Sequence, residues 1–156
     1  MDIELRKASL RDCERLHRMQ VRAFQELLRR YGDTATNPGA EPLAAVERRM
    51  RQKETDYYWI CLHGREIGAL RVVRLPENRC RLSPLFLLPE FRGRGFAKQA
   101  MAAAEAWYPR AEVWQLDTIK EEAPLCRLYE QMGYRPTGRE TPIQDGMTII
   151  DYEKRK

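Results

Sequence analysis

A pair of glycines stands where a strand-like run gives way to a helix-like run, and this junction restricts the possible folds more than any other feature of the sequence. Residues 79–90, RCRLSPLFLLPE, are largely apolar and predict a buried strand. Residues 95–108, GFAKQAMAAAEAWY, predict a helix whose alanines allow close packing. The side chains expected on its packed side are Phe96, Ala100, Ala103 and Trp107. The junction therefore predicts a helix packed against a sheet.

The rest of the chain alternates short strand-like and helix-like runs, with no internal repeat or low-complexity tract. Helices are predicted over residues 9–32, 42–53 and 123–134. Strands are predicted over residues 3–8, 56–64, 66–75, 112–119 and 146–154, with one more short strand near 135–141. This order predicts an α/β fold with one mixed sheet and helices on both faces. The length of 156 residues fits a single domain spanning residues 1–156.

Boundary signals support several of these elements. Ser9 with Asp12 three residues later is typical of a helix N-terminus, because side-chain oxygens there accept hydrogen bonds from unpaired amides. Gly32 can end that helix, and residues 32–42, GDTATNPGAEP, are the clearest loop signal. Pro84 lies inside an apparently central strand, where its missing amide predicts an edge or a bulge.

Charge and composition narrow the class of protein. Apolar residues make up 43% of the chain and charged residues 33%, and the net charge is +5 at pH 7. These values are ordinary for a globular protein, and the positive charge favours anionic partners. The basic residues are scattered, and the chain has neither a recognition-helix motif nor an aromatic-rich set of strands. Nucleic acid is therefore not an expected partner.

Metal binding, membrane insertion and secretion are not expected either. The four cysteines form no CxxC pair, and only two histidines could join them, so no metal site is predicted. No run approaches the roughly 20 apolar residues of a bilayer-spanning helix. The N-terminus lacks the long apolar segment of a secretory signal. We therefore expect a cytoplasmic location, no membrane partner, and reduced cysteines that act mostly as packing residues.

Three interpretations of the glycine turn are open from the residues alone. The turn could serve geometry only. It could be a dinucleotide fingerprint, G-x-G-x-x-G, but Lys98 stands at the third glycine position and the segment comes late in the chain. A P-loop would need GK[ST], which is missing. It could also be an anion cradle, in which the amides of residues 93–97, the helix dipole, and the side chains of Arg92, Arg94 and Lys98 meet a pyrophosphate.

The same residues resemble a known signature. RGRGFA, residues 92–97, is similar to the R/Q-x-x-G-x-G/A acyl-CoA signature of the GNAT superfamily of N-acetyltransferases, through Arg92, Gly95 and Ala97. LYEQMGY, residues 128–134, resembles the L-Y-x-x-x-G-F/Y segment of that superfamily. The two motifs come in the expected order, and the order of strands and helices agrees over nearly the whole chain.

The resemblance implies a more detailed fold and a donor site. It implies a mixed, mostly antiparallel sheet of about six or seven strands, splayed between the fourth and fifth strands, with a bulge that Pro84 marks. Acetyl-CoA would lie in that wedge, with its pyrophosphate on the glycine turn and its pantetheine arm along the preceding strand. The residues implied to bind it are Leu85, Phe86, Leu87, Arg92, Gly93, Arg94, Gly95, Phe96, Ala97 and Lys98.

The resemblance also implies the chemistry. An amine would attack the thioester directly, and Tyr129 would act as the general acid that protonates the departing sulfur. A phenol has a pKa of about 10 and a thiol about 8.5, so a tyrosine that is neutral at pH 7 can hydrogen-bond to the departing thiolate and supply its proton. The amine must itself lose a proton before it attacks. The candidate bases are Glu26, Asp117, Glu121 and Glu122, and a chain of water molecules is the alternative.

The acceptor is much less constrained than the donor. In the superfamily the first two helices and the loop before the last strand usually select it, which makes Phe24 and Tyr31 acceptor-side candidates. The expected partner is a primary amine of a small molecule or a peptide, and a homodimer is compatible with the sequence. One departure is Glu122, which stands where the superfamily often has an asparagine that contacts the CoA arm. The alternative function is a sensor or scaffold domain that binds acyl-CoA without transferring the acyl group.

Overall fold

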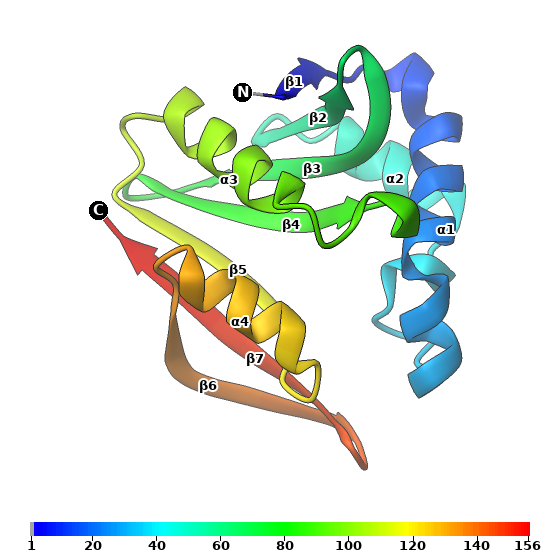
Figure 1. Ribbon diagram of the computed structural model, residues 1–156, viewed down its shortest axis with the longest axis vertical. Coiled ribbons are helices and arrows are strands. Elements are labelled where there is room, and N and C mark those ends of the chain that lie inside the picture. The colour runs from blue at the N-terminus through cyan, green and yellow to red at the C-terminus, as the bar shows by residue number, and fades with distance from the viewer. Residues whose placement is uncertain (1) are drawn as a thin grey trace.

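The computed structural model describes residues 2–156 as a seven-stranded sheet with helices on both faces (Figure 1). The strands are β1 (Ile3–Lys7), β2 (Thr55–Leu62), β3 (Arg65–Leu75), β4 (Arg79–Leu87), β5 (Val113–Ile119), β6 (Arg135–Gln144) and β7 (Met147–Arg155). The helices are α1 (Cys13–Tyr31), α2 (Leu43–Met50), α3 (Phe96–Trp107) and α4 (Ala123–Gln131), with short 3₁₀ turns at Leu10–Asp12, Pro38–Ala40 and Pro89–Phe91.

The sheet is mixed and mostly antiparallel, as predicted. Its spatial order is β1-β2-β3-β4-β5-β7-β6, and β4 and β5 form its one parallel pair. The edge strand β6 is ten residues long, whereas the sequence predicted only a short strand near residues 135–141. Its pairing with β7 is irregular near Pro136 and Pro142. Prolines are tolerated there because β6 is an edge strand. Because proline is uncommon in strands, these residues made the full length of β6 difficult to predict from the sequence.

The parallel pair is short, and this opens the sheet. Only three residue pairs join β4 to β5, ending at Arg81 opposite Gln115. Beyond this point the two strands separate, as Figure 1 shows. Just there, the register of β3 and β4 shifts, so that Ser83 and Pro84 stand opposite the single residue Arg71. This is the bulge predicted from Pro84, and a bulge bends the strand that carries it.

Two apolar clusters hold the helices to the sheet. One lies between the sheet and the α3 and α4 helices, and the other lies under α1 and α2. In α3 the buried residues are Phe96, Ala100, Met101 and Ala104. The prediction that Trp107 lies on the packed side is wrong, because it is 50% exposed. The last turn of α3 reaches the margin of the sheet, where the Trp107 ring packs edge-on against Tyr58 at 5.0 Å between centroids.

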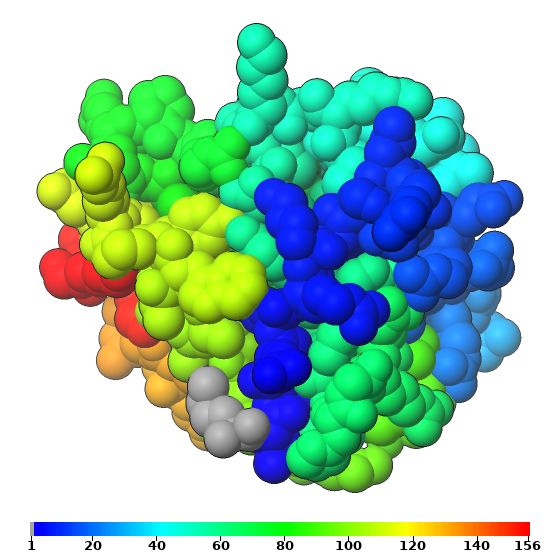
Figure 2. All heavy atoms as spheres, turned by 90° about the horizontal axis from the view of Figure 1, so that it is seen from above, coloured from blue at the N-terminus to red at the C-terminus, as the bar shows by residue number. Residues whose placement is uncertain are grey.

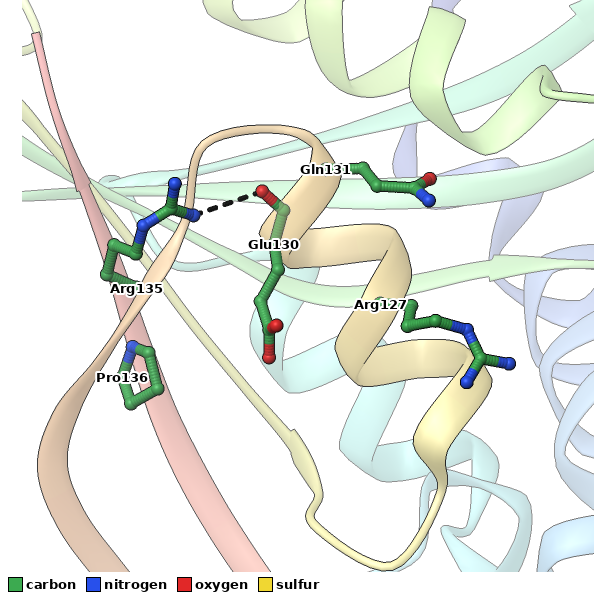
Figure 3. A pocket seen from close by; sticks show the side chains of 5 residues that line it. All are labelled: Arg127, Glu130, Gln131, Arg135 and Pro136. Carbon is green, nitrogen blue, oxygen red and sulfur yellow. Dashed lines mark hydrogen bonds between the residues drawn. The ribbon is translucent and has the colours of Figure 1, made fainter.

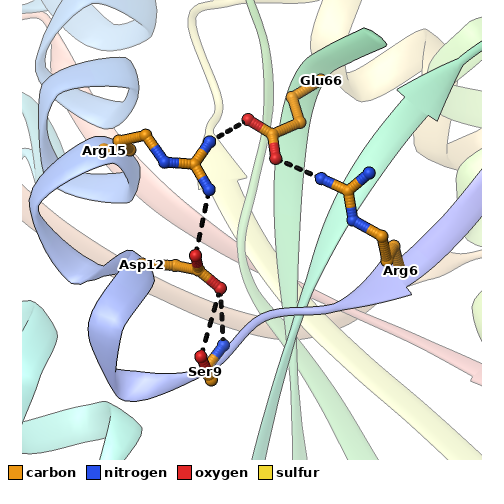
Figure 4. A network of polar contacts seen from close by, with 5 residues as sticks. All are labelled: Arg6, Ser9, Asp12, Arg15 and Glu66. Atoms are coloured by element: carbon orange, nitrogen blue, oxygen red, sulfur yellow. Dashed lines mark hydrogen bonds and ion pairs between the residues drawn. The ribbon is translucent and has the colours of Figure 1, made fainter. Parts of the chain in front are cut away.

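The N-terminal strand β1 forms the edge of the sheet opposite to β6. In the view from above, β1 (blue) lies between the C-terminal part of α3 (yellow-green) and the β2–β3 region (Figure 2). Glu66 on β3 accepts hydrogen bonds from Arg6 and from Arg15, and Arg15 also donates to Asp12 at 2.9 Å (Figure 4). The Ser9 amide donates to the same Asp12 carboxylate at 2.8 Å. This network fixes the start of the first helix, as the Ser9 and Asp12 signal predicted.

Residues 2–156 contain neither a candidate membrane-spanning helix nor a candidate metal cluster. None of the helices there combines the length and the apolar content that a bilayer crossing requires. No cluster of three or more His, Cys, Asp or Glu side chains in this part of the chain is placed to hold a metal ion. The four cysteines are free thiols, and all but Cys126 are buried.

The approach of β3 to β4 generates a stability prediction. A Cβ atom at Gly68 would lie 2.2 Å from the Phe86 carbonyl oxygen and 3.0 Å from the Leu87 Cα. We therefore expect Gly68→Ala to lower the free energy of unfolding by about 1–3 kcal/mol, because backbone atoms must move. Urea denaturation measures the change.

Gly64→Asn is the matched control for Gly68→Ala. A Cβ at Gly64 meets no heavy atom within 4 Å, and asparagine tolerates its positive φ. We expect a change below about 1 kcal/mol for this control. Equal unfolding midpoints for Gly68→Ala and the wild-type protein would contradict the close approach of the two strands.

Candidate active site

The open part of the β4–β5 wedge forms a cavity of about 1000 Å³. Its walls come from both faces of the sheet: α1 and the α1–α2 connection on one side, and the start of α3 and α4 on the other. This size is at the upper end of the range for small-molecule sites. The predicted site residues that line the cavity are Phe24, Leu85, Phe86, Leu87, Arg92, Gly93, Gly95, Phe96, Ala97, Lys98 and Tyr129. Arg94 and Tyr31 do not line it.

A second, smaller cavity of about 400 Å³ lies between α4 and the start of β6. Figure 3 shows its lining, in which Arg135 donates to the Glu130 carbonyl oxygen at 3.1 Å while Arg127 points away from that contact. It contains none of the residues singled out by the sequence, so the wedge is the candidate active site.

Unpaired backbone donors are concentrated at the start of α3. The first amide in this turn that bonds to the backbone is that of Gln99, which donates to the Gly95 carbonyl oxygen at 3.2 Å. Within the described chain, the amides of residues 93–98 donate to no backbone or side-chain acceptor. No side chain caps the helix. Such a group of amides at a positive helix end is a binding site for an anion.

Two glycines make this turn possible. Gly93 and Gly95 have φ values of 77° and 81°, which residues other than glycine rarely adopt. A Cβ at either position would meet no heavy atom within 4 Å. The space in front of the amides is therefore open, and the backbone itself can contact a ligand.

The three basic side chains of the turn have different surroundings. Lys98 lines the cavity and forms no ion pair in residues 2–156. Arg92 also lines it, but its guanidinium donates to the Ala23 carbonyl oxygen in α1 and, at 3.3 Å, to the Leu87 carbonyl oxygen. Arg94 lies over the rings of Phe91 and Phe96, outside the cavity wall. Lys98 is thus the most available cation, and Arg92 also joins α1 to β4.

The free edge of β4 presents backbone groups to the wedge. The Leu88 amide donates to the Ile67 carbonyl oxygen at 2.9 Å. Since hydrogen-bonded pairs alternate along antiparallel strands, the Phe86 backbone also faces β3, while the backbones of Leu85 and Leu87 face the wedge. The side chain of Phe86 instead packs edge-on against Phe24 of α1, with 5.7 Å between ring centroids.

Tyr129 of α4 is the buried hydroxyl of the site. The residue is 7% exposed and lines the cavity, and its ring centroid lies 6.3 Å from those of both Tyr134 and Tyr152. Its hydroxyl forms no hydrogen bond with residues 2–156, and it is not among the fully enclosed unpaired atoms. Burial raises the pKa of Tyr129 above the ordinary 10.0, and the negative charge of Asp117 adds to this effect. The phenol is therefore neutral at pH 7, so its hydroxyl carries the proton that a general acid needs.

The candidate bases are in unequal positions. Glu121 does not line the cavity and accepts a hydrogen bond from the Thr148 amide at 2.8 Å. Asp117 lines it but is paired with Arg81 at 2.5 Å. Glu26 lines it with a side chain that is 67% exposed, 3.3 Å from Arg30. Each of these three carboxylates is therefore exposed, paired with a cation or outside the cavity wall.

Glu122 takes part in a contact that the sequence does not reveal. Its carboxylate accepts hydrogen bonds from Arg30 at 2.6 Å and from the Tyr31 hydroxyl at 2.5 Å. Burial opposes ionisation, but these two donors outweigh it and lower the pKa of Glu122. Burial and the same carboxylate raise the pKa of Tyr31 to about 12. The end of α1 is thereby tied to the start of α4 beside the cavity.

The connection between α1 and α2 is a well-ordered wall. The buried Asp33 carboxylate accepts from the amides of Ala35 and Thr36, each at 3.1 Å. The buried Asn37 side chain accepts from the Gly39 amide at 2.7 Å, and Gln20 of α1 donates to the Pro38 carbonyl oxygen at 2.8 Å. The segment predicted as a loop therefore has a fixed shape where it lines the cavity.

Comparisons with known proteins agree with this architecture. The model of the acetyltransferase (GNAT) family matches residues 14–134. No curated protein sequence matches the chain. Among solved structures, the ribosomal-protein-S18-alanine N-acetyltransferase of Escherichia coli gives a TM-score of 0.77 at 12% identity, over 98% of this chain and 93% of that chain.

Two further structures have the same fold. Spermidine N-acetyltransferase of Vibrio cholerae, in complex with CoA and spermine, gives a TM-score of 0.75 at 13% identity, over 99% of this chain and 95% of that chain. The PaiA N-acetyltransferase of Thermoplasma acidophilum, in complex with coenzyme A, gives 0.73 at 18% identity, over 100% of both chains. With the family model matching most of its length, this chain belongs to the acetyltransferase (GNAT) family.

Proposed function

We propose that the protein is an acetyl-CoA-dependent N-acetyltransferase that acetylates a primary amine of a small molecule or a peptide. The observation that carries the proposal is the row of unpaired amides at residues 93–98, which faces a cavity in the splayed sheet. Two proteins of the same fold were crystallised with CoA, and family membership supports acetyl transfer.

The residues present fit acetyl-CoA. The amides of residues 93–98 and the Lys98 ammonium would hold the pyrophosphate, which can approach closely because Gly93 and Gly95 have no Cβ. The backbone of Leu85 and the amide of Leu87 would bind the pantetheine arm, whose own amide groups would take the place of a neighbouring strand. The Leu87 carbonyl oxygen already accepts a hydrogen bond from Arg92. This arm would point the thioester toward Tyr129.

The chemistry follows from that placement. Acetyl-CoA supplies an activated acetyl group as a thioester. The nitrogen of a neutral amine forms a bond to the carbonyl carbon, and the carbon–sulfur bond breaks. The Tyr129 hydroxyl donates its proton to the departing sulfur, and the proton lost by the nitrogen returns to the Tyr129 oxygen through water. Backbone amides of β4 near Leu85 would stabilise the charge on the carbonyl oxygen.

The phosphate cradle is tested by Gly95→Val. A β-branched residue is strained at the φ of 81° found there, so the turn must rearrange and the amides lose their common direction. We expect the Kd for acetyl-CoA, measured by calorimetry, to rise by about tenfold or more, as for lost hydrogen bonds to a charged group.

Gly138→Val is the control for that experiment. Gly138 has a φ of 98° and open space around a Cβ, but it lies in β6 outside the cavity wall. The control should retain the wild-type Kd. If Gly95→Val also retained it, the amides of this turn would not be the phosphate site.

The acid is tested by Tyr129→Phe. We expect kcat at pH 7 to fall by about 10²-fold or more, the usual contribution of a positioned acid, with an unchanged Kd for acetyl-CoA. Tyr152→Phe is the control, because its hydroxyl donates to Glu130 at 2.7 Å instead of facing the cavity. Retention of full activity in Tyr129→Phe would exclude the residue as the acid, and acetyl-CoA binding without transfer to any amine would favour the sensor alternative.

A further inference from the structure

The end of α1 and the start of α4 meet at the wall of the wedge cavity. α1 packs on β3 and β4, whereas α4 packs on β5. The pairing of β4 with β5 ends at Arg81 and Gln115, so beyond this point no strand pairing in residues 2–156 connects the part of the sheet under α1 with the part under α4. The separation of the two helices there depends on contacts between side chains.

Glu122 is the centre of that contact. Its side chain is only 13% exposed, and Arg30 donates to both of its carboxylate oxygens at 2.6 Å. The Tyr31 hydroxyl donates to one of them at 2.5 Å. Glu122 and Arg30 both line the cavity. A carboxylate only accepts hydrogen bonds, and donors from α1 occupy both oxygens, so this side chain is directed at α1.

Tyr31 receives a second contact from the C-terminal part of the chain. Gln144, the last residue of β6, donates to the Tyr31 carbonyl oxygen at 2.6 Å. Tyr31 itself does not line the cavity, although the sequence placed it on the acceptor side. Its contacts instead make it a link between the last turn of α1, the start of α4 and the end of β6.

The place of Glu122 at the start of α4 relates it to Tyr129. The Glu122 carbonyl oxygen accepts from the amides of Leu125 and Cys126, at 3.1 and 3.2 Å, in the first turn of the helix. Tyr129 follows seven residues after Glu122, which is about two turns of an α-helix and about 10 Å along its axis. Residues at this spacing lie on the same side of a helix, and both line the cavity. The carboxylate therefore anchors the end of the helix that carries the proposed acid.

The same spacing occurs on α1. Phe24 stands seven residues before Tyr31, lines the cavity and packs against Phe86 of β4. About two helical turns therefore separate the Glu122 contact from the acceptor-side wall on α1, and about two turns separate it from Tyr129 on α4. Because both helices are continuous between these points, the contact determines how far Tyr129 stands from Phe24.

We propose that Glu122 is a positioning residue of the transfer reaction, which holds Tyr129 at a fixed distance from the α1 wall of the acceptor site. It acts through Arg30 and Tyr31 and not by contact with the donor or the acceptor. A displacement of about 1 Å at a reacting group can lower a rate about a hundredfold, so a small separation of α1 from α4 would weaken proton donation to the departing sulfur. This inference rests on the proposed acetyl transfer and adds a residue to its machinery.

Glu122→Gln tests this role. The amide keeps the size of the side chain and can still accept from Tyr31, but it loses the charge that pairs with Arg30. Thiol release from acetyl-CoA is measured with spermidine and with a short peptide that has a free N-terminal alanine, and the faster acceptor of the wild-type protein is used. We expect kcat to fall about tenfold to a hundredfold, whereas the Kd for acetyl-CoA, measured by calorimetry, should stay at the wild-type value.

Glu105→Gln is the matched control. Glu105 of α3 is paired with Lys154 of β7 at 2.8 Å, its side chain is 12% exposed, and neither residue lines the cavity. The control removes a comparable ion pair between distant segments and should keep the wild-type kcat. An equal fall in kcat in the control would mean that Glu122 has only a structural role. A raised Kd for acetyl-CoA with an unchanged kcat in Glu122→Gln would make Glu122 a donor contact and overturn the proposal.

Tyr31→Phe tests the contact from the side of α1. It removes one donor to Glu122 outside the cavity wall, so kcat should fall, but less than in Glu122→Ala. The double variant Tyr31→Phe/Glu122→Ala should lose no more than Glu122→Ala alone, because both substitutions act on one contact. Losses that multiply in the double variant, or an unchanged kcat in both single variants, would overturn the assignment.

The wild-type measurements separate this inference from the proposed function. No binding of acetyl-CoA to the wild-type protein, or no thiol release with any amine, would contradict the proposed function itself. A wild-type protein that transfers acetyl groups, together with variants of Glu122 that transfer them equally fast, would contradict only the positioning role.

Discussion

The short pairing of β4 with β5 is the constraint on which the rest of the site depends. Three residue pairs hold the two strands together, and the bulge at Ser83 and Pro84 follows immediately. A parallel pair that ends inside a sheet leaves two edges with unsatisfied backbone groups. A cavity of about 1000 Å³ lies between these two edges. A ligand with amide groups of its own could therefore form hydrogen bonds with the free backbone groups along the edge of β4.

The two sides of the wedge are built on different principles. On the α3 side the site consists mainly of backbone: the amides of residues 93–98 are free because glycines shape the turn and no side chain caps the helix. On the α1 side it consists of side chains on a rigid frame, with Phe24 packed on Phe86 and the α1–α2 connection held by Asp33 and Asn37. A backbone site tolerates changes of sequence, whereas a side-chain site can be altered to select another acceptor.

Much of the architecture could be predicted because it depends on local chemistry. Proline within a strand indicated the bulge, Ser9 and Asp12 indicated the start of the first helix, and the glycine turn indicated the free amides. Each of these signals involves residues close together in the chain. The backbones of Leu85 and Leu87 face the wedge, whereas that of Phe86 does not. This could not be predicted from the sequence, because it depends on the register between β3 and β4.

The parts that could not be predicted depend on contacts between distant segments. Glu122 meets Arg30 and Tyr31 across about ninety residues of sequence, and the residue spacing carries no sign of it. The exposure of Trp107 was mispredicted because helical periodicity assigns a face but does not say where the sheet beneath it ends.

Amide hydrogen exchange in the presence and absence of acetyl-CoA is the most direct test of the central claim, which is that unpaired amides in the wedge bind the donor. In the free protein the amides of residues 93–98 should exchange rapidly, although they adjoin a stable helix, because they have no acceptor in the described chain. Acetyl-CoA should protect these amides, and those of Leu85 and Leu87, more than any others. Protection confined to other parts of the protein, or no protection at saturating acetyl-CoA, would contradict the account.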